Sequence, residues 1–358
     1  MSAIFGHLNV SDSEYVYNAT QGQRVIYDAV LKYLETVNAE LEKALSVFVD
    51  ESTSDHKRRY KLPGGGTLQR RGPDGRYGSV KAYGQWDVAF SLEDFGAQVA
   101  GNDVDMAYMT VTDLDRHIQT VVTQNVGTVR YEMLKRILNN VQTTFVDDKW
   151  GSLSIEPLAN GDTVTYPPVL GSESEATDSH YLESNYAASA ISDTNNPFAT
   201  IRDELEEHFG TQTGGSSILV FVNNAQRAKI EALSDFDAVP FSYIRPGQDT
   251  DLPINLPAGT PGSLMGTCSG VIIDEWRWIP ANYMVGIHLD APKPLIRRVD
   301  DPATGLGTGL QLVAEDEEYP FKGSFWRNRF GLGAGNRLNG VVLELGTGGT
   351  YSIPSGYS

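Results

Sequence analysis

The longest helical pattern in the chain reads TDLDRHIQTVVTQNVGTVRYEMLKRILNNVQTTFV and covers residues 112–146. Its apolar residues recur every three or four positions, which places them on one face of a helix. They are Ile118, Val121, Val122, Val129, Met133, Leu134, Ile137, Leu138, Val141 and Phe145. Thr110 or Thr112 is suited to cap this helix, and Asp113 and Asp115 suit its first turn. At 1.5 Å per residue the helix would be about 50 Å long, so we expect it to form a spine for the fold.

A second amphipathic helix is expected upstream of the spine, over residues 23–48, because its apolar residues follow the same spacing. Residues 1–21 are polar and show no regular periodicity, which is typical of an extended arm that a partner must order.

Residues 55–81, between the two helical patterns, are a basic segment in an acidic chain. They contain eight Lys and Arg and two Asp, a net charge of +6, so the other 331 residues carry −24. Turn sequences at 63–66 and 72–75 interrupt short extended pieces, which predicts a long, projecting β-hairpin. Little of the segment is apolar before Val80, so we expect it to lie on another chain for support.

The rest of the chain predicts a small α/β unit followed by a β-rich region. The expected helices cover residues 196–209 and 224–233. The expected strands cover residues 217–222, 271–274, 283–289, 295–299 and 341–345.

Composition excludes several classes of protein. The chain has 358 residues and 40% hydrophobic content, which indicates a globular protein. A net charge of −18 opposes general attraction to nucleic acids or anionic membranes. The single cysteine, Cys268, excludes an internal disulfide framework and a cysteine-rich zinc ribbon. The N-terminus lacks a signal-peptide pattern and no segment reaches about 18 apolar residues, so we expect neither standard export nor a membrane span.

Three motifs invite a chemical interpretation. The sequence GTCSG at 266–270 has the spacing of a nucleophile elbow, but β-branched residues 271–273 follow where a helix is required, so we interpret it as a loop before a strand. The patterns of alternating glycine at 305–309 and 331–335 lack the lysine and the following helix of a phosphate loop, and we interpret both as turns.

Metal or cofactor chemistry finds no support in the sequence. Glu204 and His208 are four residues apart on a predicted helix and could share a metal, but no third ligand lies nearby in the sequence. The paired aspartates at 103/105, 235/237 and 249/251 lack the spacing of a calcium loop. We therefore expect no catalytic, cofactor-binding or metal-ligating residues, and no cofactor.

The order of these parts resembles the major capsid proteins of tailed phages with the Hong Kong 97 type fold. The resemblance covers nearly the whole chain and rests on element order and on short stretches at residues 86–94, 221–230, 278–290, 315–318, 325–330 and 339–345. It implies an α+β fold with an N-terminal arm, an extended β-hairpin loop, a peripheral domain with the spine helix and a β-sheet, and an axial α/β domain. The implied boundaries are 1–50 for the arm and first helix, 51–91 for the extended loop, 92–154 and 282–358 for the peripheral domain, and 155–281 for the axial domain.

The resemblance also implies a structural function without catalysis. Subunits of this family self-assemble into hexamers and pentamers of an icosahedral shell that encloses double-stranded DNA, in a virion assembled in the host cytoplasm. The implied partners are copies of the same chain, a separate scaffolding protein, a portal and a decoration protein, with no membrane and no sequence-specific DNA binding. The basic hairpin would contact an acidic surface of a neighbouring subunit. The candidate contact residues are Lys57, Arg58, Arg59, Lys61, Arg70, Arg71, Arg76, Glu315, Asp316, Glu317 and Glu318.

Two alternatives remain open at the level of sequence. An encapsulin-like nanocompartment shell uses the same subunit to enclose an enzyme, and the arm and hairpin do not separate it from a virus. A soluble hydrolase that uses paired carboxylates or Cys268 is the remote alternative.

Overall fold

The structure is a computed structural model, and it describes residues 23–61, 72–73, 75, 85–102, 108, 110–169, 175–209, 217–238, 260–316 and 321–358. The chain divides into two compact units. Unit 1 consists of Met1–Glu40, Asp94–Val129 and Gly307–Arg329, and unit 2 of Leu41–Glu93, Arg130–Leu306 and Phe330–Ser358. Four elements begin in one unit and end in the other: α2 (Gln23–Leu45), β4 (Glu93–Asn102), α4 (Val111–Leu138) and β15 (Phe321–Ala334).

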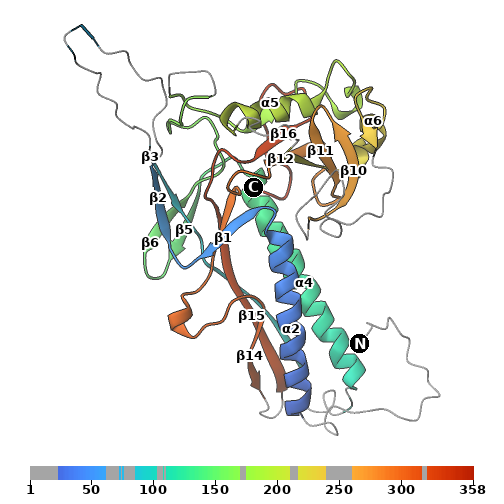
Figure 1. Ribbon diagram of the computed structural model, residues 1–358. Coiled ribbons are helices and arrows are strands. Elements are labelled where there is room, and N and C mark those ends of the chain that lie inside the picture. The colour runs from blue at the N-terminus through green and yellow to red at the C-terminus, as the bar shows by residue number, and fades with distance from the viewer. Residues whose placement is uncertain are drawn as a thin grey trace. The chain divides into compact units, whose positions relative to one another are not determined.

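Unit 1 is built from parts of these two helices and from strands that pair with β15 (Figure 1). Strands β4 (Glu93–Asn102) and β14 (Gln311–Asp316) both pair with β15. The core of the unit joins both helices to these strands through Val30, Leu34, Ile118, Val121, Val122, Leu310 and Trp326. The side-chain amide of Asn38 clamps β14 to α2, since it donates to the carbonyl of Leu310 at 3.1 Å and accepts from the Leu310 N–H at 3.1 Å.

The start of α4 agrees with the prediction and its end does not. Thr110 caps the helix, because its hydroxyl oxygen accepts from the Asp113 N–H at 3.2 Å and donates to the Asp113 carboxylate at 2.7 Å. The helix ends at Leu138, so the expected continuation to residue 146 is wrong. Asn139 turns the chain there, because its side-chain oxygen accepts from the Val141 N–H at 2.8 Å.

The segment after this turn is a short hairpin of β5 (Thr143–Asp147) and β6 (Gly151–Ile155). Its β-branched residues favour a strand over a helix. Val141 and Val146 are exposed rather than part of the helical core. The first helix also ends earlier than expected, at Leu45, and Phe48 is fully buried where it stacks on Phe221 at a ring separation of 5.0 Å.

The larger sheet of unit 2 has seven strands in the order β7-β16-β12-β8-β11-β10-β9. The strands are β7 (Tyr181–Glu183), β8 (Ile218–Val222), β9 (Asp237–Ala238), β10 (Ser263–Cys268), β11 (Val271–Glu275), β12 (Tyr283–His288) and β16 (Val341–Glu344). All residues of the central strand β8 are buried, as its continuous apolar sequence predicts. Strand β11 runs parallel to β8, and β12 runs antiparallel to it.

Helix α5 (Pro197–Phe209) covers this sheet (Figure 1). Phe198, Ile201 and Leu205 are fully buried on one helical face and belong to the same core cluster as the strand residues Val220 and Met284. The helix was predicted over these residues and is confirmed. The second predicted helix, 224–233, is shorter than expected, because the chain forms the 3-10 turn η2 (Asn224–Gln226) and then α6 (Arg227–Ile230).

Strands β1 (Val49–Thr53) and β13 (Leu295–Arg298) pair in parallel, and β13 also pairs antiparallel with the end of β15, so both belong to the five-stranded sheet that contains β14, β15 and β4. Strands β2 (Lys57–Lys61) and β3 (Gln85–Ala89) form a separate antiparallel pair. The remaining short helices are η1 (Ala188–Ala190) and η3 (Pro302–Thr304).

The glycine pattern at 331–335 was interpreted from the sequence as a turn. This is wrong for Gly331 and Gly333, which lie within β15. A Cβ atom at Gly331 would lie 1.9 Å from the Ser91 carbonyl oxygen, and one at Gly333 would lie 2.7 Å from the Phe90 ring. Every second residue of a strand faces the same side, so these glycines open one face of β15 to the segment that follows β3.

Among the described residues, no helix is both long enough and apolar enough to cross a membrane.

Candidate functional site

The base of the predicted hairpin is present as strands β2 and β3. Their register pairs Lys57 with Ala89 and Lys61 with Gln85, so the chain leaves and returns at one place. The candidates Arg70, Arg71 and Arg76, beyond this base, lie outside the described residues, as does the side chain of Lys61.

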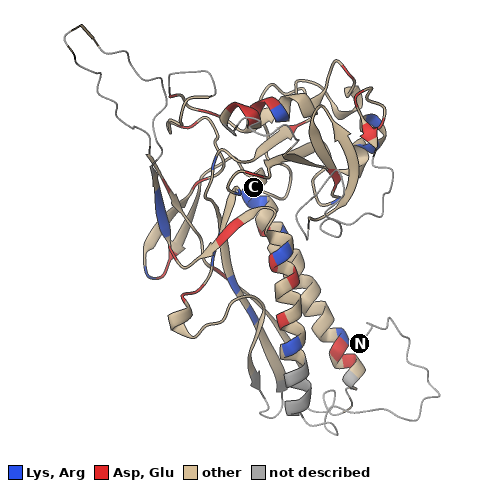
Figure 2. Cartoon of the chain, in the orientation of Figure 1, with Lys and Arg blue, Asp and Glu red and all other residues tan. Residues whose placement is uncertain are grey.

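The basic residues of β2 are paired with acids of the same chain (Figure 2). Asp87 on β3 accepts from Lys57 Nζ at 2.7 Å and from Arg59 at 2.6 and 2.9 Å. The Arg59 hydrogen bonds and then that of Lys57 hold the pKa of Asp87 well below its usual range. Arg58 contacts Glu51 and lies 2.9 Å from Asp55. The three cations therefore have counterions within their own subunit, two of which, Glu51 and Asp87, lie outside the segment whose charge was counted from the sequence.

The hairpin base is also anchored by apolar contacts that the sequence analysis did not anticipate. Trp86 and Phe90 are buried in one cluster with Tyr166, Ile296 and Leu338. The rings of Trp86 and Tyr166 lie 5.3 Å apart. The base consequently has support from its own chain, and the expectation of support from another chain applies only to the residues beyond it.

A polar cleft of about 500 Å³ adjoins the hairpin base and is lined by Arg59, Asp87, Glu156, Asp162 and Arg337, among others. The buried guanidinium of Arg337 lies 2.7 Å from the Asp162 carboxylate and donates to the Pro157 carbonyl at 2.8 Å. These contacts hold the side chain of Arg337 against the backbone in the wall of the cleft, which indicates that Arg337 stabilises the fold rather than binding a ligand.

The acidic candidates lie in unit 1, whereas the described basic candidates lie in unit 2. Glu315 and Asp316 are the last residues of β14, and their side chains are outside the described set. Glu317 and Glu318 are outside it entirely. Their role as contact residues stays a prediction.

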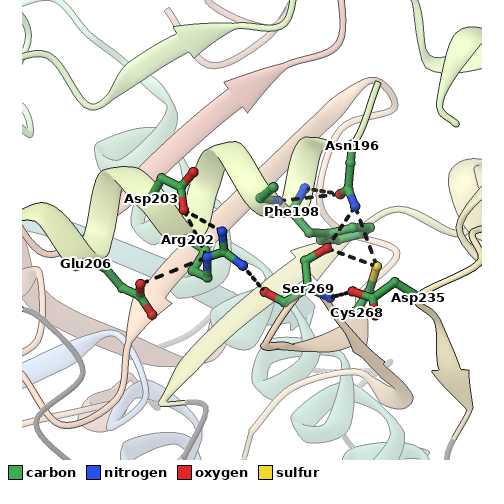
Figure 3. Close-up of polar contacts among 9 residues, drawn as sticks. Asn196, Phe198, Arg202, Asp203, Glu206, Asp235, Cys268 and Ser269 are labelled. Atoms are coloured by element: carbon green, nitrogen blue, oxygen red, sulfur yellow. Dashed lines mark hydrogen bonds and ion pairs between the residues drawn. The ribbon is translucent and has the colours of Figure 1, made fainter. Parts of the chain in front are cut away.

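The first three residues of the motif, 266–268, are the end of β10, and the last two form the turn to β11, so the expectation of a loop is correct only for residues 269–270, and the strand expected after the motif is present (Figure 3). The thiol is buried, and its sulfur lies 4.0 Å from the Asn196 amide and 3.7 Å from the Ser269 hydroxyl. Burial raises the pKa of the Cys268 thiol. Ser269 is fixed in turn, because its N–H donates to Asp235 at 2.7 Å and its carbonyl accepts from Arg202 at 2.8 Å. A buried thiol with a raised pKa is not poised as a nucleophile, and within the described part of the chain its polar contacts are with Asn196 and Ser269 rather than with a histidine base.

The structure brings together a cluster that the sequence analysis missed. Asp178 and His180 lie immediately before β7, and His208 lies in the last turn of α5. The Nε2 atoms of His180 and His208 both lie 2.8 Å from the same Asp178 oxygen, Oδ2. His180 is fully buried. From the sequence, His208 was paired only with Glu204 as a possible metal ligand, because 30 residues separate it from Asp178. The one sequence signal for the observed cluster was the spacing of Asp178 and His180, two residues apart in an extended segment.

Carboxylates of α5 surround this cluster. Glu207 Oε1 lies 3.4 Å from His208 Nε2. Burial, followed by the negative charges of Asp178 and Glu207, raises the pKa of Glu204 to about 8. The cluster is thus rich in groups that bind protons or cations.

Comparison with known proteins identifies the fold. No protein-family model matches the sequence. No curated protein matches it either. Among solved structures, the chain is similar to one from Mycobacterium phage Patience, with a TM-score of 0.66, 17% sequence identity and coverage of 97% of each chain. The chain therefore shares its fold with this phage structure over nearly its whole length, in agreement with the phage-type fold expected from the sequence.

Two further similarities are weaker. The mature capsid of bacteriophage PhiM1 matches with a TM-score of 0.49 and 12% identity, covering 82% of this chain and 85% of that chain. The capsid of a native GTA particle matches with a TM-score of 0.48 and 10% identity, covering 85% of this chain and 90% of that chain.

Proposed function

We propose that this chain is the major capsid protein of a tailed phage, a subunit that assembles into the hexamers and pentamers of an icosahedral shell around double-stranded DNA. The observation that carries the proposal is the agreement in fold with a phage structure over 97% of both chains. The elements that a shell subunit requires agree with it: a two-stranded base for a projecting hairpin, a helix of 28 residues, and a separate α/β sheet. In the mature particle the protein would reside in the virion and would act as a structural protein without catalysis.

The domain roles follow the boundaries expected from the sequence. Residues 51–91 would be the extended loop that lies over a neighbour, residues 92–154 and 282–358 the peripheral domain, and residues 155–281 the core of the axial domain. Strands β12 and β16 complete the α/β sheet from the second part of the chain.

Contact between subunits would be directed by charge. Lys57, Arg58 and Arg59 have partners in their own chain, so we assign the contact with a neighbouring subunit to the other candidate cations of the loop, Lys61, Arg70, Arg71 and Arg76. The acidic run Glu315, Asp316, Glu317 and Glu318 of a neighbouring subunit is the proposed counterpart.

Other partners follow from the same proposal. A separate scaffolding protein would guide assembly, a portal would occupy one vertex, and a decoration protein would bind the outer surface. The acidic net charge of −18 would limit adhesion of packaged DNA to the wall, because few phosphates would find cations there.

An encapsulin-like nanocompartment shell is the second candidate, since it would use the same fold around an enzyme cargo. Genome neighbourhood separates the two: a terminase and a portal gene nearby indicate a virus, whereas a ferritin-like or peroxidase gene indicates a compartment.

The test of the proposal is electron microscopy and size-exclusion chromatography of the purified full-length chain, with and without a candidate scaffolding protein. Closed shells, hexamers or pentamers are expected. A well-behaved monomer under both conditions would refute the proposal.

The charge contact has a test of its own. The triple variant R70E/R71E/R76E is expected to remain folded and to lose shell assembly. A control with the same change in net charge reverses three exposed cations outside the loop, K32E/K149E/R277E, and is expected to assemble. Equal assembly of both variants would contradict the role of the loop while leaving the shell proposal intact.

A further inference from the structure

The Asp178, His180 and His208 cluster presents two ring nitrogens to one carboxylate oxygen. His180 Nε2 and His208 Nε2 each lie 2.8 Å from Asp178 Oδ2, and the two rings are 5.7 Å apart. The three ligand atoms all lie within 4.8 Å of one another. His180 is 0% exposed and His208 5% exposed, so little water reaches either ring.

The second nitrogen of His180 restricts what can occupy this position. Nδ1 lies 3.0 Å from the carbonyl oxygen of Gly340, which can only accept a hydrogen bond. A proton on Nδ1 leaves the lone pair of a neutral His180 on Nε2, directed at the negative oxygen of Asp178. That contact is repulsive unless a second proton or a cation lies between the two atoms.

We propose that Asp178, His180 and His208 bind a divalent transition-metal ion of the zinc type. Two imidazoles and a carboxylate are a ligand set that Zn²⁺ prefers. The Nδ1–H of His180 on the Gly340 carbonyl is the second-shell contact that fixes the tautomer of a metal-binding histidine. With bonds of about 2.0 Å, ligands of a tetrahedral ion lie about 3.3 Å apart, so the 2.8 Å separations need to open by only about 0.5 Å.

Nearby carboxylates supply the fourth ligand and balance the charge. Glu207 Oε1 lies 3.4 Å from His208 Nε2, which puts it in reach of the fourth position. Two neutral histidines with the carboxylates of Asp178 and Glu207 give a neutral site around a divalent ion. Glu204 and Glu207 also approach Asp178 to within 4.8 Å, so further carboxylate oxygens lie around an ion bound at this end of α5.

The ion would join three parts of unit 2 that are distant in sequence. Asp178 and His180 lie before β7, His208 ends α5, and the Gly340 carbonyl immediately precedes β16. The chain already holds this segment by backbone hydrogen bonds, from the His180 N–H to Ala159 and from the Val342 N–H to His180, both at 2.9 Å. A metal would stabilise the folded unit without taking part in a reaction.

The experiment uses the full-length protein and zinc alone. Protein stripped with EDTA and desalted is titrated with ZnCl2, and bound metal is counted by mass spectrometry. We expect one zinc per chain and a rise in the unfolding temperature of about 4 °C at a hundredfold excess over Kd. Zinc-edge X-ray absorption is expected to report two histidine nitrogens at about 2.0 Å, and this measurement needs no variant.

Variants locate the ion. H208Q and D178N are expected to lose stoichiometric zinc and the zinc-dependent rise in unfolding temperature. H117Q removes an exposed histidine of α4 and is expected to behave as the wild type. Wild-type protein that retains no zinc and unfolds at the same temperature with zinc or EDTA would overturn the proposal and leave a proton-bridged cluster. Undiminished zinc in a folded H208Q would also overturn it. Neither result depends on shell assembly.

Discussion

Ionisation of the buried Asp274 is expected to lower the free energy of unfolding by an amount that can be measured. Asp274 lies in β11, next to the central strand β8 of the seven-stranded sheet, and is 0% exposed. Burial, with a smaller contribution from the charge of Glu275, raises the pKa of Asp274 to about 7 against the opposing effect of the Ser263 N–H. The unfolded chain ionises this carboxyl near pH 4, whereas the folded chain keeps it protonated to about pH 7.

The sign of the pH dependence follows from proton counts. Between about pH 4 and pH 7 the folded state holds one more proton than the unfolded state, so stability falls as pH rises and levels off above pH 7. At about 1.4 kcal/mol per pKa unit, the penalty is about 2 kcal/mol at pH 5.5 and about 4 kcal/mol at pH 8. Asparagine has the same shape and no charge, so D274N is expected to gain about 2 kcal/mol on the wild type between these two pH values.

Urea unfolding of both proteins at pH 5.5, 6.5, 7.5 and 8, followed by circular dichroism, measures this gain. An unpaired amide would shift D274N by a constant amount at every pH, so the diagnostic quantity is the change with pH. D148N, which neutralises an exposed carboxylate in a turn, serves as the control for altered net charge. A difference between D274N and wild type that stays constant from pH 5.5 to pH 8 would refute the reasoning.

Three further predictions concern the free energy of unfolding, each measured by urea denaturation. G331A is expected to destabilise the protein by several kcal/mol, because its Cβ would lie 1.9 Å from the Ser91 carbonyl oxygen. As a control, the Cβ of G127A in α4 meets nothing within 4 Å, and this variant is expected to stabilise the protein by up to about 1 kcal/mol. Equal effects of the two substitutions would contradict the packing described for β15. F198A is expected to cost about 3–5 kcal/mol, since this ring of α5 is fully buried in the core shared with the sheet, and a cost below about 1 kcal/mol would show that α5 is not held by this core. T110A is expected to cost about 1 kcal/mol through loss of the α4 cap, with T123A on the exposed face of the same helix as a control that retains the cap.

The repeating elements were predictable because their periodicity is local. The apolar run of β8 and the apolar stripe of α5 each predict which of their residues are buried, and both elements were found at the expected residues. The end of α4 was not predictable from the stripe alone, since Val141 and Phe145 continue the helical spacing by coincidence. The turn is made by the Asn139 side chain, whose preference competes with the helix.

Contacts between distant residues escaped the sequence for a different reason. Gly331 and Gly333 are required because the segment that follows β3 packs closely against them, and this segment lies some 240 residues earlier in the chain. The approach of Asp178 and His180 to His208 likewise depends on how α5 is laid on the sheet. The counterions of the hairpin base were missed because Glu51 and Asp87 lie just outside the segment whose charge was counted.

Asp87 has a consequence for the kinetics of association. One carboxylate holds Lys57 and Arg59 on the neighbouring strand, while Trp86 beside it is locked in an apolar cluster. The free subunit therefore has little rotamer freedom left to lose at this point of the chain when it meets a partner, and the entropic cost of association falls on the residues beyond the strands. Added salt would then slow the encounter by screening the charges of the loop, whereas the apolar burial of Trp86, which salt does not screen, would keep the hairpin base in place.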